Sequence, residues 1–413
     1  MIIMPIIICA LGLFLIIRLG PFFILHPRRI LRALKPSLAS RESRESFFLA
    51  LAGTLGVGNI FGVSLGIIVG GVGSIFWIVI SSVFSMIIKY SEVVLGFSVS
   101  NIRYGMPSVI AEGGGRIRRA CASLYALLGI ALSLFMGALM QTRSITDTAL
   151  GGGINEKIVT LAVLLCTLYF VVFGSEKIKK ATYYIIPLTT IIYISLVFFV
   201  IIRNYQSVIP GLKSIVSAAL SFKSAAGGTL GALVGCGFRE GFLRGVMSNE
   251  AGAGTSLVGH SADASRKAGV AGLFGIFEVV FDTLILCPLT GIAIVISGVP
   301  ICGTPMALVT AAFSSSLGGW VNILLVFLVF SFAYSTIMSL YYYGVSYTEY
   351  LSLPRPIFSL LFLAFIFISP AFPEGFVTVI DVILLLMTLP TAYCIIKNVG
   401  MIKHHTDEML NLK

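Results

Sequence analysis

The stretch Gly53-Thr54-Leu55-Gly56-Val57-Gly58-Asn59 places three glycines in the middle of an apolar segment that extends from residue 46 to residue 69. Glycine inside a helix costs about 1 kcal/mol relative to alanine, so this cluster predicts an interrupted helix. A second cluster, Gly227-Gly228-Thr229-Leu230-Gly231, lies in a later apolar segment and shares the tetrapeptide Gly-Thr-Leu-Gly. We therefore expect two broken helices.

The rest of the chain has the composition of a membrane protein. Of its 413 residues, 57% are hydrophobic and 11% are charged, against about a quarter charged in soluble domains. Long apolar runs such as 182–202 favour helices over the alternating strands of a barrel. The net charge of +11 is distributed between the apolar runs, which argues against nucleic acid as a partner. No Cys-x-x-Cys pair is present among the seven cysteines, and no cofactor is expected.

A bilayer-spanning helix needs about 20 mainly apolar residues. By this criterion we predict an all-α polytopic membrane protein with eleven transmembrane helices: 2–24, 46–69, 74–99, 120–149, 158–174, 182–202, 214–246, 269–298, 319–349, 357–369 and 376–396. Most of the 28 basic residues fall in alternate loops, and the loops 299–318 and 370–375 have none. The positive-inside rule therefore predicts a multi-pass protein of the cytoplasmic membrane, with its N-terminus outside and its C-terminus inside.

The positions of the two glycine clusters predict an internal repeat. The first helix and a basic cytoplasmic loop form residues 1–45, and ten spans then divide into two groups of five, at 46–202 and 203–396, before a cytoplasmic tail at 397–413. Because five is an odd number, the second group is inserted upside down relative to the first. Each group opens with a broken helix, the best pointer in a sequence to the binding site of a secondary transporter.

Unwound backbone in the membrane needs polar partners, because lipid cannot satisfy freed amides and carbonyls. Amides at the start of a half-helix suit a carboxylate, and freed carbonyls with nearby hydroxyls suit a dehydrated sodium ion. The two breaks thus favour a small zwitterion and a cation over a lipid or a sugar. The alternative is that the glycines only allow close helix packing.

Several motifs carry a family resemblance. In chain order they are Ala52-Gly-Thr-Leu-Gly-Val-Gly-Asn-Ile60, Gly70-Gly-Val-Gly-Ser-Ile-Phe-Trp77, Lys89-Tyr-Ser-Glu92, Arg244-Gly-Val-Met-Ser-Asn-Glu-Ala-Gly-Ala-Gly254, Asp282-Thr-Leu284, Phe332-Ala-Tyr-Ser-Thr-Ile337 and Tyr342-Tyr-Gly344. Together they resemble the signature of the alanine or glycine:cation symporter family, within the amino acid-polyamine-organocation superfamily. The resemblance implies sodium-coupled uptake of a small neutral amino acid by a leucine-transporter fold.

The resemblance also implies a set of site residues. Its substrate-binding positions fall on Thr54, Gly56, Gly58, Asn59, Gln141 and Thr336. Its sodium ligands fall on the carbonyls of Ala52 and Leu55 and the hydroxyls of Ser335 and Thr336. The second glycine cluster adds Gly228 and Thr229 to the predicted substrate site, and Leu340 forms part of its wall.

Departures from the family pattern bear on the substrate. Val57 replaces a threonine of the family, Ala138 an asparagine, and Ser339-Leu340 a Gly-Trp pair. Since the tryptophan closes the family's pocket over alanine, Leu340 leaves a pocket of different size or shape. Alanine or glycine is the first expectation, and serine or a larger neutral amino acid is the alternative. We expect the protein to work as a monomer in the lipid bilayer.

Charged groups in the spans are costly and become functional candidates. They include Glu92, Asp147, Glu278 and Asp282. Glu278 and Asp282 lie four residues apart and leave open a membrane-embedded enzyme, and the glycine clusters leave open a channel. A structural role is the other interpretation, with Lys89 pairing with Glu92.

The remaining polar residues have local interpretations. Arg239, Glu240 and Arg244 are expected toward the inner end of the span 214–246, as an interfacial set or a cytoplasmic gate. Residues 248–250 form a turn, and His260 lies in a cytoplasmic loop.

Overall fold

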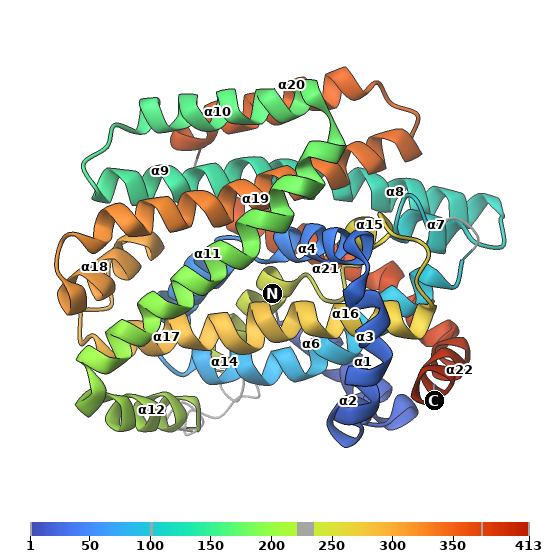
Figure 1. The fold of residues 1–413 in the computed structure, drawn as a ribbon, viewed down its shortest axis with the longest axis horizontal. Helices are drawn as coiled ribbons and strands as arrows, with labels where there is room; N and C mark the ends of the chain where they lie inside the picture. Colours follow the sequence, from blue (N-terminus) through green and yellow to red (C-terminus); the bar gives the residue numbers. More distant parts are fainter. Residues whose placement is uncertain (1, 100–101, 221–234, 373–374, 412–413) are drawn as a thin grey trace.

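The computed structural model describes residues 2–99, 102–220, 235–372 and 375–411. The regular structure of this part of the chain is entirely helical. Most helices pack along the long axis of the molecule, and α11 (Ser175–Arg203) crosses them obliquely (Figure 1). The predicted all-helical membrane architecture is confirmed.

The helices of the described residues agree with most predicted spans. Seven segments are long and apolar enough to cross a membrane: Arg41–Gly70, Ser74–Phe97, Arg116–Gly151, Lys177–Arg203, Ala268–Ile296, Val321–Tyr350 and Phe376–Lys397. Shorter apolar helices cover Ile3–Leu19, Pro305–Leu317 and Arg355–Ala371. The total of eleven spans stays a prediction, as does the division into repeats.

The chain passes through its helices in an order that repeats. The first series is α4 (Arg41–Thr54), η1 (Gly58–Gly62), α5 (Val63–Gly70), α6 (Ser74–Phe97), the short α7 (Met106–Ala111), α8 (Arg116–Leu132), η2 (Ser133–Met140), α9 (Gln141–Gly151), α10 (Glu156–Phe173) and α11. The second is α14 (Cys236–Asn249), α15 (Leu257–His260), α16 (Ala268–Val279), η4 (Val280–Leu286), α17 (Cys287–Ile296), the short α18 (Pro305–Leu317), α19 (Val321–Tyr350), α20 (Arg355–Ile368), η5 (Ser369–Ala371) and α21 (Phe376–Lys397). A broken helix opens each series.

Four further helices lie outside this order, namely α1 (Ile3–Leu19), α2 (Phe22–Leu25), α3 (Pro27–Ala39) and α22 (Val399–Leu410), and α12 (Tyr205–Leu220) connects the two series. The predicted span 214–246 differs from the structure at its second end, because α14 begins only after Gly235 and continues past residue 246 to Asn249. The predicted outer loop 299–318 contains α18, and the predicted tail contains α22.

The two broken helices cross in opposite directions. A Cβ on Gly70, at the end of α5, would lie 3.1 Å from the carbonyl oxygen of Cys236, at the start of α14. At the other end, Ser46 Oγ in α4 donates to the carbonyls of Gly259 and His260, which belong to α15, at 3.0 and 2.9 Å. The first helices of the two predicted repeats are therefore antiparallel, as an inverted repeat requires.

A polar clamp closes the end of this crossing near the start of α4. Ser43 Oγ donates to Asp263 Oδ2 at 2.5 Å, and Arg266 Nη2 donates to Ser46 Oγ at 2.7 Å. Burial raises the pKa of Asp263, but hydrogen bonds from Ser265 and Ser43 outweigh that effect and hold the pKa below its usual value. Asp263 therefore stays ionised and holds α4 to the loop that precedes α16.

Candidate functional site

The first broken helix ends at Thr54 and resumes at Gly58, and the residues between have lost part of the helical bonding. The amide of Gly56 bonds to the carbonyl of Thr54 at 2.8 Å, so the carbonyl of Ala52 loses the partner that a continuous helix would give it. Thr336 Oγ1 of α19 donates to this carbonyl at 2.7 Å. The predicted break is confirmed, and a side chain from the second series satisfies it.

Gly56 is the point of closest approach in this break. A Cβ on Gly56 would lie 2.3 Å from Thr336 Oγ1 and 3.0 Å from Gln141 Oε1, so only glycine fits without displacement. Gln141 Oε1 also accepts the amide of Val57 at 3.2 Å. The predicted residues Gly56, Gln141 and Thr336 thus meet around the unwound backbone.

The side chains of α19 hold the end of α4 along one face. Ser339 Oγ donates to the carbonyl of Leu49 at 3.1 Å, and Tyr343 Oη lies 3.4 Å from the same oxygen. Ser335 is fully buried, but its hydroxyl donates to the carbonyl of Phe332 in its own helix at 2.8 Å. Among the predicted sodium ligands, Thr336 and Ala52 are therefore hydrogen-bonded to each other, whereas the Ser335 hydroxyl bonds within α19.

A second break follows α14, between Glu250 and Ser256. Glu250 has a φ of 53°, a left-handed conformation that is rare outside glycine, and Gly252 and Gly254 also have positive φ. Asn249 Oδ1 accepts the amide of Ala251 at 2.9 Å, so the turn begins at the end of α14, later than the predicted 248–250. The cluster at 227–231, with Gly228 and Thr229, lies outside the described residues, so the break that the structure shows in α14–α15 is a different one.

The helical segments beside the two breaks meet at Gly58 of η1 and Ser248 of α14. A Cβ on Gly58 would lie 3.3 Å from the Cα of Ser248. Ser248 Oγ lies 2.7 Å from Asn59 Oδ1 and 2.6 Å from Asp282 Oδ2, and all three side chains are buried. Ser248 therefore links the start of the resumed first helix to the buried carboxylate of η4. The sequence placed Ser248 and Asp282 in two family motifs, but it did not predict that their side chains meet.

Charged residues of α6 hold the second break. Lys89 Nζ donates to the carbonyl of Asn249 at 2.7 Å, and Glu92 Oε1 accepts the amide of Gly252 at 2.5 Å. Both side chains are buried. The expected Lys89–Glu92 pair near the surface is corrected by these contacts, because each side chain bonds to the unwound backbone.

A further buried contact joins the first break to α15. His260 Nε2 lies 2.9 Å from Glu278 Oε2, and Thr54 Oγ1 lies 3.5 Å from Glu278 Oε1. His260 is fully buried in the structure, so its expected place in a cytoplasmic loop is wrong. Glu278 and Asp282 bond to different groups and do not form the acid pair of a hydrolase.

Widened helical turns occur at three points of this site. The π-helix η1 contains Asn59, η2 ends directly before Gln141, and η4 contains Asp282. Such turns are rare and frequently accompany functional sites, because they leave backbone groups without their usual partners. Neither glycine content nor apolar periodicity predicts η2 or η4.

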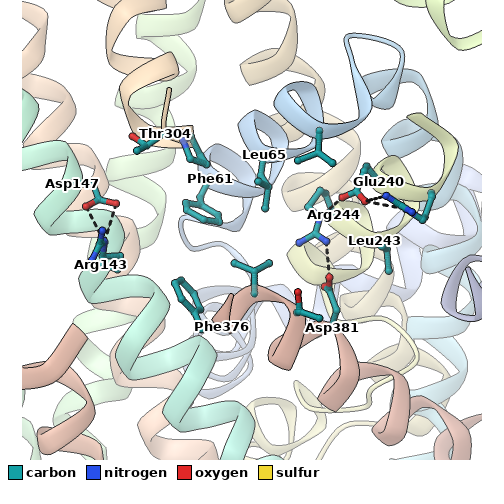
Figure 2. Close-up of a pocket in the computed structure, with 15 residues that line it drawn as sticks. Phe61, Leu65, Arg143, Asp147, Glu240, Leu243, Arg244, Thr304, Phe376 and Asp381 are labelled. Carbon is teal, nitrogen blue, oxygen red and sulfur yellow. Dashed lines mark hydrogen bonds and ion pairs between the residues drawn. The ribbon is translucent and has the colours of Figure 1, made fainter. Parts of the chain in front are cut away.

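A cavity of about 400 Å³ lies on the Gly70 side of the crossing, between α5, α9, α14, α18 and α21. Figure 2 shows the Arg143–Asp147 pair on one side of it, the Arg244–Asp381 pair on the other, and Phe61 between them. Arg244 Nη2 lies 2.6 Å from Asp381 Oδ2.

Arg239, Glu240 and Arg244 lie at this cavity. They line the cavity near the end of α5, opposite the end of the crossing that the basic N-terminal segment adjoins. Their expected position toward the inner end of the span 214–246 stays a prediction.

The remaining predicted residue, Leu340, packs against η2. A Cβ on Gly137 would lie 2.7 Å from Leu340 Cβ. Leu340 is one turn from Thr336 on α19, and Gly137 is one turn before Gln141. Leu340 therefore contacts the helix that carries Gln141.

A model of the family described as "Sodium:alanine symporter family" matches residues 1–410. The chain belongs to this family. It is therefore a sodium-coupled amino acid symporter and a multi-pass membrane protein, not an enzyme.

Curated relatives extend over most of the chain. The sodium/alanine symporter AgcS of Methanococcus maripaludis is 29% identical over 84% of this chain and 80% of its own length. The amino-acid carrier protein AlsT of Bacillus subtilis is 30% identical over 84% of this chain and 75% of its own length. The probable sodium/glutamine symporter GlnT of Bacillus subtilis is 28% identical over 82% of this chain and 72% of its own length.

A solved structure shares the fold. The crystal structure of MhsT in complex with L-phenylalanine aligns with a TM-score of 0.62 at 17% identity, and covers 89% of this chain and 92% of that one. This likeness confirms the leucine-transporter fold that the sequence predicted.

Proposed function

We propose that this symporter imports a small neutral amino acid, with alanine or glycine as the first substrate, through the crossing of its two broken helices. The observation that carries the proposal is the contact of the two broken helices at Gly58 and Ser248, close to Gly56, Gln141 and Thr336. Freed amides and carbonyls at this point supply partners for a carboxylate, an ammonium and a cation.

The proposed substrate site consists of the residues around the first break: Thr54, Gly56, Gly58, Asn59, Gln141, Thr336 and Leu340. Amides at the start of η1 face the carboxylate of the amino acid. The Gln141 amide and the Thr336 hydroxyl orient the remainder of the amino acid. Because Gly56 leaves little room between Thr336 and Gln141, the site favours a short side chain.

Sodium is the proposed coupling ion, held by the carbonyls of Ala52 and Leu55 with the hydroxyls of Ser335 and Thr336. The contact from Thr336 to Ala52 already brings two of these oxygens to 2.7 Å. In this arrangement the ion orders the same backbone that binds the amino acid, so each increases the affinity for the other by the same factor. Carbonyl and hydroxyl oxygens suit a hard monovalent cation.

The cavity lined by Phe61 and Arg244 is the proposed access path. It lies on the side that the positive-inside prediction places outside the cell, whereas the clamp of Ser43 and Asp263 closes the other end. Alternating access then opens the clamp and closes the cavity. A monomer provides all of these groups.

The substrate is tested by competition in liposomes that contain the purified protein. Labelled alanine uptake is driven by an inward sodium gradient and challenged with excess unlabelled alanine, glycine, serine, glutamine or phenylalanine. We expect strong inhibition by alanine and glycine and weak inhibition by phenylalanine. Stronger inhibition by glutamine than by alanine would contradict the proposed short-side-chain pocket, and uptake without sodium would contradict the coupling ion.

A further inference from the structure

An apolar groove of about 440 Å³ lies between the N-terminal helix α3 and the helices α4, α11 and α16, and it ends at Leu55 of the first break. Its floor is formed by the buried side chains of Phe47, Leu51, Leu55 and Phe274. Its rim is exposed, since Leu31 is 62% and Ile191 64% accessible. In a bilayer, this groove faces hydrocarbon.

The groove has the depth of one lipid leaflet. From Arg44 at one end to Leu55 at the other, α4 advances by about 16 Å at 1.5 Å per residue. The hydrocarbon of one leaflet is about 15 Å deep. A single acyl chain that starts at α3 would therefore reach the first break.

A basic stripe of α3 borders the groove. At 100° per residue, Arg28, Arg32 and Lys35 share one face of the helix, directly beside the face of Leu31 and Leu38 that lines the groove. All three basic side chains are exposed. A helix with a basic face beside an apolar face lies in the membrane interface and attracts anionic lipid.

Two polar atoms at the groove support a bound headgroup and glycerol. Arg44 donates through Nη1 to the carbonyls of Leu38 and Ala39, whereas its Nε is buried and has no hydrogen-bond partner among the described residues. Thr190 Oγ1, on the wall from α11, is also buried without a partner in that part of the chain.

We propose that this groove is a binding site for one anionic phospholipid. Its acyl chain lies against Phe47, Leu51 and Leu55, and its phosphate lies at Arg44 and the basic stripe of α3. Because Leu55 belongs to the first break, the bound chain packs against the segment that carries the transport site, and it joins α3 to α11 and α16.

The test is lipid retention, measured by native mass spectrometry on the full-length protein in a nonionic detergent. The protein is titrated with phosphatidylglycerol or with phosphatidylcholine of the same acyl chains. We expect one tightly held phosphatidylglycerol and markedly weaker phosphatidylcholine. This readout needs no transport, so it stands apart from the proposed substrate and coupling ion.

Two variants separate the headgroup from the chain. The triple variant Arg28→Gln, Arg32→Gln, Lys35→Gln removes three surface charges. Each charge contributes about fivefold to the affinity for an anionic lipid, so phosphatidylglycerol binding is expected to weaken roughly a hundredfold. Leu38→Trp places an indole at the exposed rim and is expected to weaken the binding of both lipids.

The control is Arg116→Gln, Arg119→Gln, Lys403→Gln, which removes the same charge from exposed positions elsewhere. It should bind phosphatidylglycerol as the wild type does. Equal retention of the two lipids by the wild type would overturn the proposal. So would wild-type phosphatidylglycerol affinity in either the stripe variant or Leu38→Trp, each checked for an unchanged melting temperature.

Discussion

At the scale of single residues, the site depends on groups that replace a broken helix's own hydrogen bonds. Thr336 donates to the carbonyl of Ala52, and Lys89 donates to the carbonyl of Asn249. Gln141 accepts a hydrogen bond from the amide of Val57. In lipid each unsatisfied backbone group would cost several kcal/mol. The side chains that bind the breaks therefore also make the breaks possible.

Ser335→Ala tests the proposed sodium site. If Ser335 Oγ is a ligand, its loss should raise the sodium concentration for half-maximal uptake by about fivefold, or about 1 kcal/mol. Ser331→Ala is the matched control, because Ser331 also donates to a carbonyl of α19 at 2.8 Å. Sodium dependence is measured in liposomes for both variants. An identical sodium requirement in the two would remove Ser335 from the ion site.

At the scale of elements, the first break was predictable and the second was not. Three glycines within Gly53–Asn59 predict the first break, because the low helix preference of glycine is a signal in the local sequence. The second break has fewer glycines than the segment 227–231, and it is held by Lys89 and Glu92 from α6. Such tertiary partners leave no local signal, so glycine content pointed elsewhere.

The position of α14 was mispredicted for a related reason. Apolar length alone joined its residues to those of α12, although α14 begins only at Cys236. The three-way contact of Ser248 with Asn59 and Asp282 was equally hidden, because its members are far apart in the chain.

Asp381→Asn tests how firmly α14 is held to α21. The Arg244 and Asp381 side chains are 4% and 7% exposed, and loss of their charge-assisted hydrogen bond costs about 1.5–3 kcal/mol, because Glu240 still pairs with Arg244 at 3.4 Å. The variant should therefore show a clearly lower melting temperature in detergent. Glu349→Gln is the control, because its pair with Arg103 is exposed and worth at most about 1 kcal/mol. Equal melting temperatures for the two variants would contradict the structural role of Asp381.

At the scale of the whole molecule, the antiparallel crossing of α4–α5 with α14–α15 joins the two halves of the chain. One end of the crossing has the charged cavity and the other has the Ser43–Asp263 clamp. Binding at the crossing can thus influence both ends. The proposed alternating access requires this coupling, and in that proposal the contact of Gly58 with Ser248 is its centre.

The most direct test of this account is alanine accumulation in liposomes under an imposed inward sodium gradient, compared for wild type, Gly58→Val and Gly400→Val. Valine at 58 would press on the backbone of Ser248, whereas a Cβ at Gly400 meets nothing within 4 Å. We predict accumulation by the wild type and Gly400→Val, and none by Gly58→Val with an unchanged elution profile and melting temperature. Wild-type accumulation by Gly58→Val would contradict a transport site at the crossing.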